Sequence, residues 1–112
     1  MKTITWADFE KIAIHIGTII KVEDFPEAKK PAYKIWVDFG EEIGTKKTSA
    51  QVTFHYTKQD LLGKQILGVI NFEPKQIANF TSEFLLTGFA DADGNIIIST
   101  VEKPTPNGSK LI

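Results

Sequence analysis

The segment "TKQDLLG", residues 57–63, interrupts a chain that otherwise consists mostly of predicted strands. Thr57 and Asp60 have the spacing of a capping box, in which each side chain accepts a hydrogen bond from the backbone N–H of the other residue. Gly63 then supplies the residue type that most often ends a helix. We therefore predict a short helix in the middle of the chain.

Three strands are predicted before this helix. Residues 12–25, "IAIHIGTIIKVEDF", are rich in β-branched residues and predict a long first strand, in which Gly17 is typical of a bulge or sharp bend. Residues 32–40, "AYKIWVDFG", alternate between apolar and polar positions, as a half-buried strand does. Residues 44–54, "GTKKTSAQVTF", alternate in the same way, with a basic start and a small apolar face.

Further strands follow the helix. Residues 64–72, "KQILGVINF", predict a buried strand. Residues 73–79, "EPKQIAN", predict a single helical turn that ends in a left-handed conformation at Asn79. Residues 82–90 and 95–101 predict two strands joined by an Asp-Gly hairpin turn.

Three strands, a helix and further strands are the order of the OB-fold, a five-stranded Greek-key barrel with a helix between its third and fourth strands. We therefore predict an all-β fold of this kind, formed as a single domain over residues 1–112. Thr5 and Asp8 repeat the capping pattern and predict a second short helix over residues 6–11. Other small barrels contain similar strands, and the mid-chain helix is the feature that favours the OB-fold.

The composition restricts the classes of function. The chain has no cysteine, which excludes disulfides and thiolate metal sites. Asp8 comes before any long apolar run, so neither a signal peptide nor membrane insertion is expected, and the expected location is cytoplasmic. The formal net charge is −1 and every positive charge is a lysine, so a nucleic acid would be held by point charges and not by bidentate arginine contacts.

Residues suited to catalysis are few. His15 lies in the first predicted strand and His55 follows the third, and both are expected at ordinary surface or hydrogen-bonded positions. No histidines or carboxylates have the spacing of a metal site, and no serine stands in a nucleophile motif. We expect no enzyme activity, no cofactor and no metal.

A polar surface is predicted where OB-folds bind their ligands, across the second and third strands. Its side chains are Lys34, Trp36, Lys47, Ser49 and Gln51, next to the loop lysines Lys29 and Lys30. A base that stacks on an exposed aromatic ring gains ~1–3 kcal/mol, while nearby lysines hold the phosphates. The same residues would also suit a solvated barrel exterior or, at Trp36, a subunit contact.

Three segments occur together and in order: "IHIGTIIKVEDFPEAKKPAYKIWVDFG", "KKTSAQVT" and "NFEPKQIANFTSE". With them, nearly the whole chain resembles the CsaA family of bacterial proteins. That family is part of a wider group of tRNA-binding domains, which are also appended to methionyl- and phenylalanyl-tRNA synthetases and found in endothelial-monocyte-activating polypeptide. The resemblance implies an OB-fold homodimer that binds tRNA and has a linked role as an export-related chaperone for unfolded polypeptides.

The resemblance also implies individual binding residues. Asn71 and Ser82 match polar positions associated with the tRNA surface in the wider group, and Lys75 follows Pro74 at a step that carries arginine or lysine there. Family resemblance, and not charge, therefore favours RNA as the ligand. The alternatives are a peptide-holding chaperone without significant RNA binding and a domain whose surface serves only assembly.

The N-terminal helix predicts an interface. Trp6, Phe9 and Ile12 give it more apolar bulk than the closure of one barrel end requires. A surface patch of this kind usually marks an interface, and in a two-fold dimer the patch contacts its own copy. We therefore expect a homodimer that brings two binding surfaces together.

Overall fold

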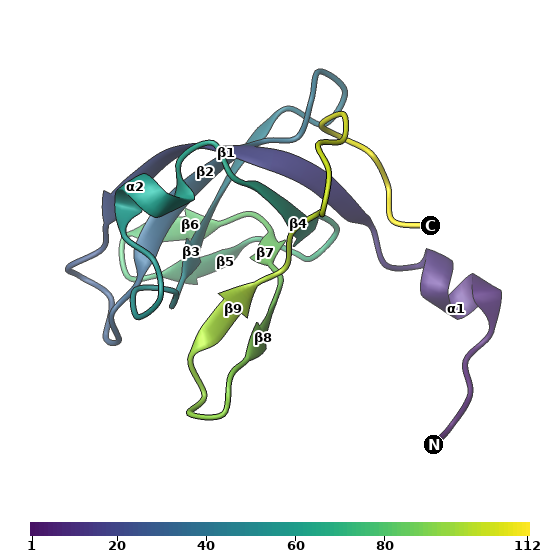
Figure 1. Cartoon of the computed structure of the whole chain (residues 1–112), viewed down its shortest axis with the longest axis horizontal. Coiled ribbons are helices and arrows are strands. Elements are labelled where there is room, and N and C mark those ends of the chain that lie inside the picture. Colours follow the sequence, from purple (N-terminus) through teal and green to yellow (C-terminus); the bar gives the residue numbers. More distant parts are fainter.

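The computed structural model describes residues 1–112 and contains two short helices and nine strands, most of them wound into a barrel (Figure 1). In chain order the elements are α1 (Trp6–Glu10), β1 (Ile14–Asp24), β2 (Tyr33–Asp38), β3 (Thr45–Ala50), α2 (Lys58–Leu61), β4 (Gln65–Val69), β5 (Lys75–Ile77), β6 (Phe80–Ser82), β7 (Leu85–Leu86), β8 (Gly88–Ala90) and β9 (Ile96–Ile98).

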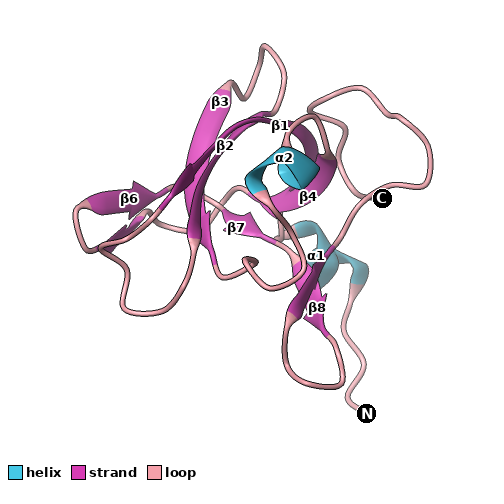
Figure 2. Ribbon diagram, turned by 60° about the vertical axis from the view of Figure 1, so that its left-hand side comes forward, coloured by secondary structure: helices cyan, strands magenta, loops and turns pink.

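The barrel is one antiparallel sheet with the strand order β3-β2-β1-β4-β7. The helix α2 comes between β3 and β4, and its Leu61 is fully buried in the core, so the helix covers one end of the barrel (Figure 2). The strands β5 and β6 form a separate hairpin, as do β8 and β9. The predicted five-stranded OB-type barrel is confirmed, and both predicted helices begin with a complete capping box.

The core is filled from the faces that the sequence alternation predicts. Ile35 and Val37 of β2 and the following Phe39 are fully buried. Phe39 packs edge-to-face against Phe84, with ring centroids 5.0 Å apart. The intervening side chains of β2 therefore point to the outside, where a ligand can reach them.

The bulge that was predicted at Gly17 lies elsewhere in β1. A Cβ atom at Gly17 would lie 2.4 Å from Val37 Cγ1, so the glycine is needed for close packing between β1 and β2. The register of these strands shifts instead between Ile19 and Lys21, which makes Ile20 the extra residue.

The helical turn predicted over residues 73–79 is wrong, because this segment enters the β5–β6 hairpin. Ile77 pairs with Phe80, and Ala78 adopts the left-handed conformation (φ 52°) that was expected at Asn79. A single turn of helix has little stability of its own. Burial of Phe80, which is 6% exposed, therefore determines the local structure.

All the predicted strands are longer than the observed ones, and contacts with distant residues interrupt two of them. The third strand ends at Ala50 and not at residue 54, because the chain turns away towards Tyr56, whose carbonyl accepts a hydrogen bond from the Tyr33 hydroxyl. The strand predicted over residues 82–90 divides at Thr87, whose N–H and hydroxyl both donate to Leu67 O. Both interruptions come from contacts with residues far away in the sequence.

The helix α1 stands away from the barrel, and none of its residues is buried (Figure 1). The last residues of the chain return to β1, where His15 and Lys110 form an isolated bridge. No helix has both the length and the apolar character to cross a membrane.

Candidate nucleic-acid interface

Two rows of paired side chains cross the outer face of β1, β2 and β3. The rows are Lys21–Trp36–Lys47 and Glu23–Lys34–Ser49. Side chains that oppose one another on one face of a sheet have Cβ atoms about 4.5–5.5 Å apart. The two rows therefore form one continuous surface of lysine, aromatic and hydroxyl groups.

The second row continues beyond β3 onto the β5–β6 hairpin. The backbone N–H of Ser49 donates to Ser82 Oγ over 3.0 Å, and the two hydroxyl oxygens are 3.2 Å apart. Within the hairpin, Lys75 is the partner of Ser82 in register. The hairpin thus extends the polar surface by one more hydroxyl and one more lysine.

An aromatic cluster supports the lysines of this surface. The ring of Phe80 packs edge-to-face against Phe25 and Trp36, with centroid distances of 5.6 and 5.9 Å. The ammonium nitrogens of Lys34 and Lys47 lie 5.4 and 5.1 Å from the centroid of the Phe80 ring. Cation–π attraction at these distances holds two positive charges close together.

The charges of Lys34 and Lys47 are available to a ligand, because neither ammonium group forms an ion pair. Lys21 is different: it lies 4.5 Å above the Trp36 ring and pairs with Glu23 at 3.2 Å. The remaining acidic side chain nearby is Glu83, and its Oε1 accepts the backbone N–H of Lys47 over 2.9 Å. Glu83 keeps its negative charge, but the polar surface holds four lysines, Lys21, Lys34, Lys47 and Lys75, against the two carboxylates Glu23 and Glu83, so it is positive although the whole chain is not.

Six of the eight predicted binding residues meet on this surface. They are Lys34, Trp36, Lys47, Ser49, Lys75 and Ser82. Gln51 lies beyond the end of β3, where it lines a groove. Asn71 stands elsewhere: its Oδ1 accepts Ala13 N–H and its Nδ2 donates to Lys11 O, so its side chain fastens the segment between α1 and β1.

Sequence reasoning missed the aromatic residues beneath the lysines. Phe80 was overlooked because the preceding segment was predicted as a helical turn, and Phe25 because it was taken only as the last residue of the first predicted strand. The available signal was the hydrophobic pairing of Ile77 and Phe80 across a tight turn. Lys21 could have been found from the alternation of the first strand.

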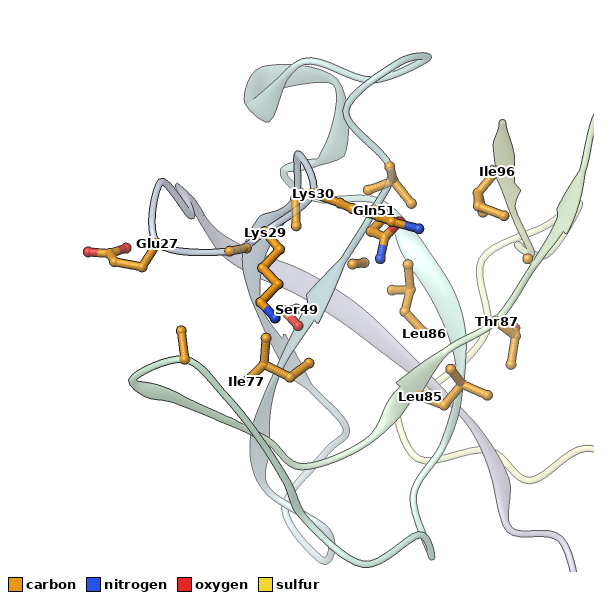
Figure 3. A pocket seen from close by; sticks show the side chains of 16 residues that line it. Glu27, Lys29, Lys30, Ser49, Gln51, Ile77, Leu85, Leu86, Thr87 and Ile96 are labelled. Carbon is orange, nitrogen blue, oxygen red and sulfur yellow. The ribbon is translucent and has the colours of Figure 1, made fainter. Parts of the chain in front are cut away.

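The groove lies beside this surface, between β3 and β7, and has a volume of about 890 Å³ (Figure 3). Ala50, Val52, Ile77, Leu85, Leu86 and Ile96 contribute its apolar lining. Lys29 and Lys30, together with Glu27 and Gln51, stand around it. Ser49 lines the groove and also belongs to the second polar row, so the two features are contiguous.

The two histidines occupy hydrogen-bonded positions. His15 Nδ1 lies 2.8 Å from Gly108 O. His55 Nε2 lies 2.6 Å from Asp91 Oδ2, and this contact is the main cause that lowers the pKa of the Asp91 carboxyl. No three side chains of the types that commonly bind metals are grouped closely enough to hold an ion.

Comparison with known proteins matches this arrangement to a family. The family model described as "Putative tRNA binding domain" matches residues 14–110, which include the whole polar surface. The chain belongs to the tRNA-binding domain family.

Two crystal structures of family relatives have the same fold. The chaperone CsaA from Bacillus anthracis superimposes with a TM-score of 0.92 and is 39% identical in sequence. The match covers 99% of this chain and 100% of the CsaA chain. The CsaA chaperone protein from Picrophilus torridus superimposes with a TM-score of 0.90 and is 48% identical in sequence. This match covers 98% of this chain and 100% of the Picrophilus chain. These identities place the chain with the CsaA proteins inside the tRNA-binding domain family.

Longer family members match over a part of their length. The methionine–tRNA ligase of Methanocaldococcus jannaschii is 31% identical over 111 residues, which are 99% of this chain and 17% of the ligase. The ligase of Pyrococcus horikoshii is 32% identical over the same number of residues, 15% of its length. The chain therefore spans about a sixth of these curated relatives.

Proposed function

We propose that the chain is a non-catalytic tRNA-binding protein and that the two polar rows are its RNA-binding surface. One observation carries this proposal: the ammonium groups of Lys34 and Lys47 both lie over the Phe80 ring, and neither forms an ion pair with a carboxylate. Membership of the tRNA-binding domain family supports RNA as the ligand.

The surface would bind RNA mainly through its backbone. Lys34 and Lys47 would contact neighbouring phosphates, with Lys75 at the end of the row. The hydroxyls of Ser49 and Ser82 can each share hydrogen bonds with phosphate or ribose oxygens. The half-exposed Trp36 offers an aromatic contact for an unpaired base, which is worth ~1–3 kcal/mol.

Lysine is a point charge without the planar fork of arginine, so single contacts of this kind are weak and sensitive to salt. We propose that a homodimer compensates for this weakness. Two copies of the surface in one assembly would act on one tRNA at a high effective concentration. The exposed apolar side chains of α1 provide the contact for such a dimer.

Titration of the wild-type protein with bulk tRNA at about 50 and 200 mM salt tests this function, because phosphate contacts lose affinity steeply over that interval. We expect measurable binding at the lower salt and a large loss at the higher. Poly-glutamate of similar charge is the control for unspecific attraction of polyanions. Absence of tRNA binding at the lower salt would overturn the proposal.

A second function, as a chaperone for unfolded polypeptides, is supported by the apolar groove and by the two related structures described as chaperones. The groove would hold apolar segments that a folded client conceals. We expect the protein to slow the aggregation of a chemically denatured test enzyme. Unchanged aggregation kinetics at a molar excess of the protein would exclude this role.

We propose the cytoplasm as the place where both functions act. The absence of cysteine suits a reducing compartment, and tRNA is present there. Fractionation of cells that carry a tagged copy would test this location. Recovery of the tagged chain outside the cytoplasmic fraction would contradict it.

A further inference from the structure

We propose that the groove binds an extended polypeptide segment, with apolar side chains and an acidic flank, as an added strand that pairs with the chain where it leaves β3, at Gln51. The proposal rests on the chaperone function above and names the kind of segment and its mode of binding. Such addition combines backbone hydrogen bonds, which give affinity, with pockets for alternate side chains, which give selectivity.

Backbone hydrogen-bonding groups are free where the chain leaves β3. Along β3 itself the outer edge is occupied: the N–H groups of Lys47 and Ser49 donate to the side chains of Glu83 and Ser82, and Lys47 O accepts the N–H of Glu83. Alternation puts the backbone of Gln51 on the same edge. Gln51 makes no hydrogen bond with its backbone or its side chain, and it is exposed. An incoming strand would find a free donor and a free acceptor at this point.

Apolar side chains line the groove next to Gln51. Ile77, Leu85 and Ile96 line the groove from three strands other than β3 (Figure 3). The side chain of Leu85 is notable because the residue remains 49% exposed although it belongs to a barrel strand. Alternate apolar side chains of an added strand would cover it and gain about 25 cal/mol for each Å² of apolar surface removed from water.

The charged side chains around the groove favour an acidic segment. Lys29 and Lys30 stand at the groove, and neither takes part in an ion pair. Glu27 lies on the same loop, so the groove carries two positive charges and one negative. An acidic residue next to the apolar part of a bound segment would be attracted by this net positive charge, and a basic residue in the same place would be repelled.

The groove and the RNA surface share structural parts, so their ligands should exclude each other. Ser49 belongs to both, and Figure 3 shows the Lys29 side chain directed towards Ser49. The β5–β6 hairpin supplies Ile77 to the groove and Ser82 to the polar row. A strand added at Gln51 would therefore lie next to the site of the phosphates. Because coupling between two ligands is reciprocal, RNA and peptide should each weaken the binding of the other.

The test uses a fluorescent synthetic peptide of about eight residues, the length of an ordinary strand, with alternating valines and two aspartates at one end. Three comparison peptides have the same length: one with a clustered order of the same residues, one with lysines in place of aspartates, and one with alternate backbone nitrogens methylated. We expect the first peptide to bind and the lysine peptide to bind more weakly. Methylation should weaken binding by about two- to tenfold for each hydrogen bond lost.

Leu85→Asp and Leu62→Asp form a matched pair of variants, since both leucines are 49% exposed and Leu62 stands outside the groove, at the end of α2. We expect Leu85→Asp to bind the peptide about tenfold more weakly than Leu62→Asp. The double variant Lys29→Glu with Lys30→Glu should prefer the lysine peptide. Circular dichroism and a urea midpoint for each variant show that it is folded.

Equal binding of the methylated and unmethylated peptides would overturn strand addition. Equal binding to Leu85→Asp and Leu62→Asp would overturn the groove as the site. If these results occur while aggregation is still suppressed, the chaperone function stands and its site is elsewhere. If peptide binding and suppression of aggregation are both absent, the chaperone function and the inference both fall.

Discussion

Lys34 and Lys47 illustrate how single residues can form a positive site on a chain without net positive charge. Both stand on the outer face of the sheet, and both approach the ring of Phe80 from their own strand. The aromatic ring attracts the ammonium groups and yet leaves them their charge. A carboxylate in the same place would neutralise them. The acidic residue beside them, Glu83, keeps its charge, but its Oε1 accepts the backbone N–H of Lys47 and the residue forms no ion pair with either ammonium group.

The double variant Lys34→Gln with Lys47→Gln should therefore weaken tRNA binding and reduce its salt dependence. Each lysine that contacts a phosphate contributes about 0.7 to 0.9 to the slope of log affinity against log salt concentration. Fluorescence titration over a range of salt concentrations measures this slope. Lys103→Gln, in the exposed segment after β9, is the control and should leave the slope unchanged. A double variant with the slope of the wild type would show that neither lysine contacts phosphate.

At the scale of elements, side chains close the barrel where a strand ladder is missing. Glu83 and Ser82 accept the N–H groups of Lys47 and Ser49, and Glu83 N donates back to Lys47 O over 2.8 Å. Thr48, which is 2% exposed, donates its hydroxyl to Phe84 O over 2.7 Å. These contacts attach β3 to the segment between β6 and β7 and thereby hold the RNA surface in shape.

Loss of the Glu83 acceptor should loosen this closure. Glu83→Ala leaves the N–H of Lys47 without its partner in a part-buried position, which we expect to lower the free energy of unfolding by about 1–3 kcal/mol. Urea denaturation measures the change. Glu83→Gln keeps a carbonyl oxygen at the same point and should lose less than Glu83→Ala. Equal stability of Glu83→Ala and the wild type would mean that this hydrogen bond does not hold the barrel closed.

The two capping boxes predict how stability depends on pH. The hydrogen bond from Lys11 lowers the pKa of the Asp8 carboxyl, and the backbone N–H of Thr57 lowers that of Asp60. Because both carboxyls hold protons less tightly when folded, they contribute stability above the pKa of the unfolded chain, and this contribution is lost as pH falls through the folded pKa. The free energy of unfolding should therefore fall below about pH 4.

Asp60→Asn separates this effect from the general effect of acid. An asparagine side chain still accepts a hydrogen bond at the cap but does not titrate. Its free energy of unfolding, measured by urea denaturation at several pH values, should fall less steeply below about pH 4 than that of the wild type. Identical slopes would show that the cap carboxylate does not contribute to the acid response.

At the scale of the whole molecule, α1 is the part that the barrel does not explain. Trp6 and Ile12 are 65% and 46% exposed, and the Trp6 and Phe9 rings lie 5.2 Å apart. A helix of five residues has little intrinsic stability, so a contact with a second copy would supply the packing that the single chain does not. In an isologous dimer these aromatic residues would be the main anchors.

Phe9→Glu should therefore produce a monomer. Because no residue of α1 is buried, the barrel should stay folded, with its urea midpoint close to that of the wild type. Light scattering at micromolar concentration measures the mass, and we expect a dimer for the wild type and a clearly lower tRNA affinity for the variant. A wild-type monomer would contradict the dimer. A monomeric Phe9→Glu protein with undiminished affinity would contradict its role in RNA binding.

Local sequence predicted the features that depend on local contacts. The capping residues Thr5 and Thr57 bond to groups three positions away, so a short pattern contains the complete interaction. Alternation in β2 likewise separates Ile35 in the core from Lys34 and Trp36 outside, because neighbouring side chains of a strand point to opposite faces. Helix positions, strand faces and barrel class followed from these patterns.

The remaining features depend on contacts between distant parts of the chain. Phe80 is buried between Phe25 and Trp36, and this burial converts the predicted helical turn into a hairpin. The same packing brings Lys34 and Lys47 over one ring, whereas Asn71 is drawn away by the backbone before β1. A hydrophobic side chain has no preferred direction until its neighbours surround it. For this reason the composition of the site became evident only when the strands were in register.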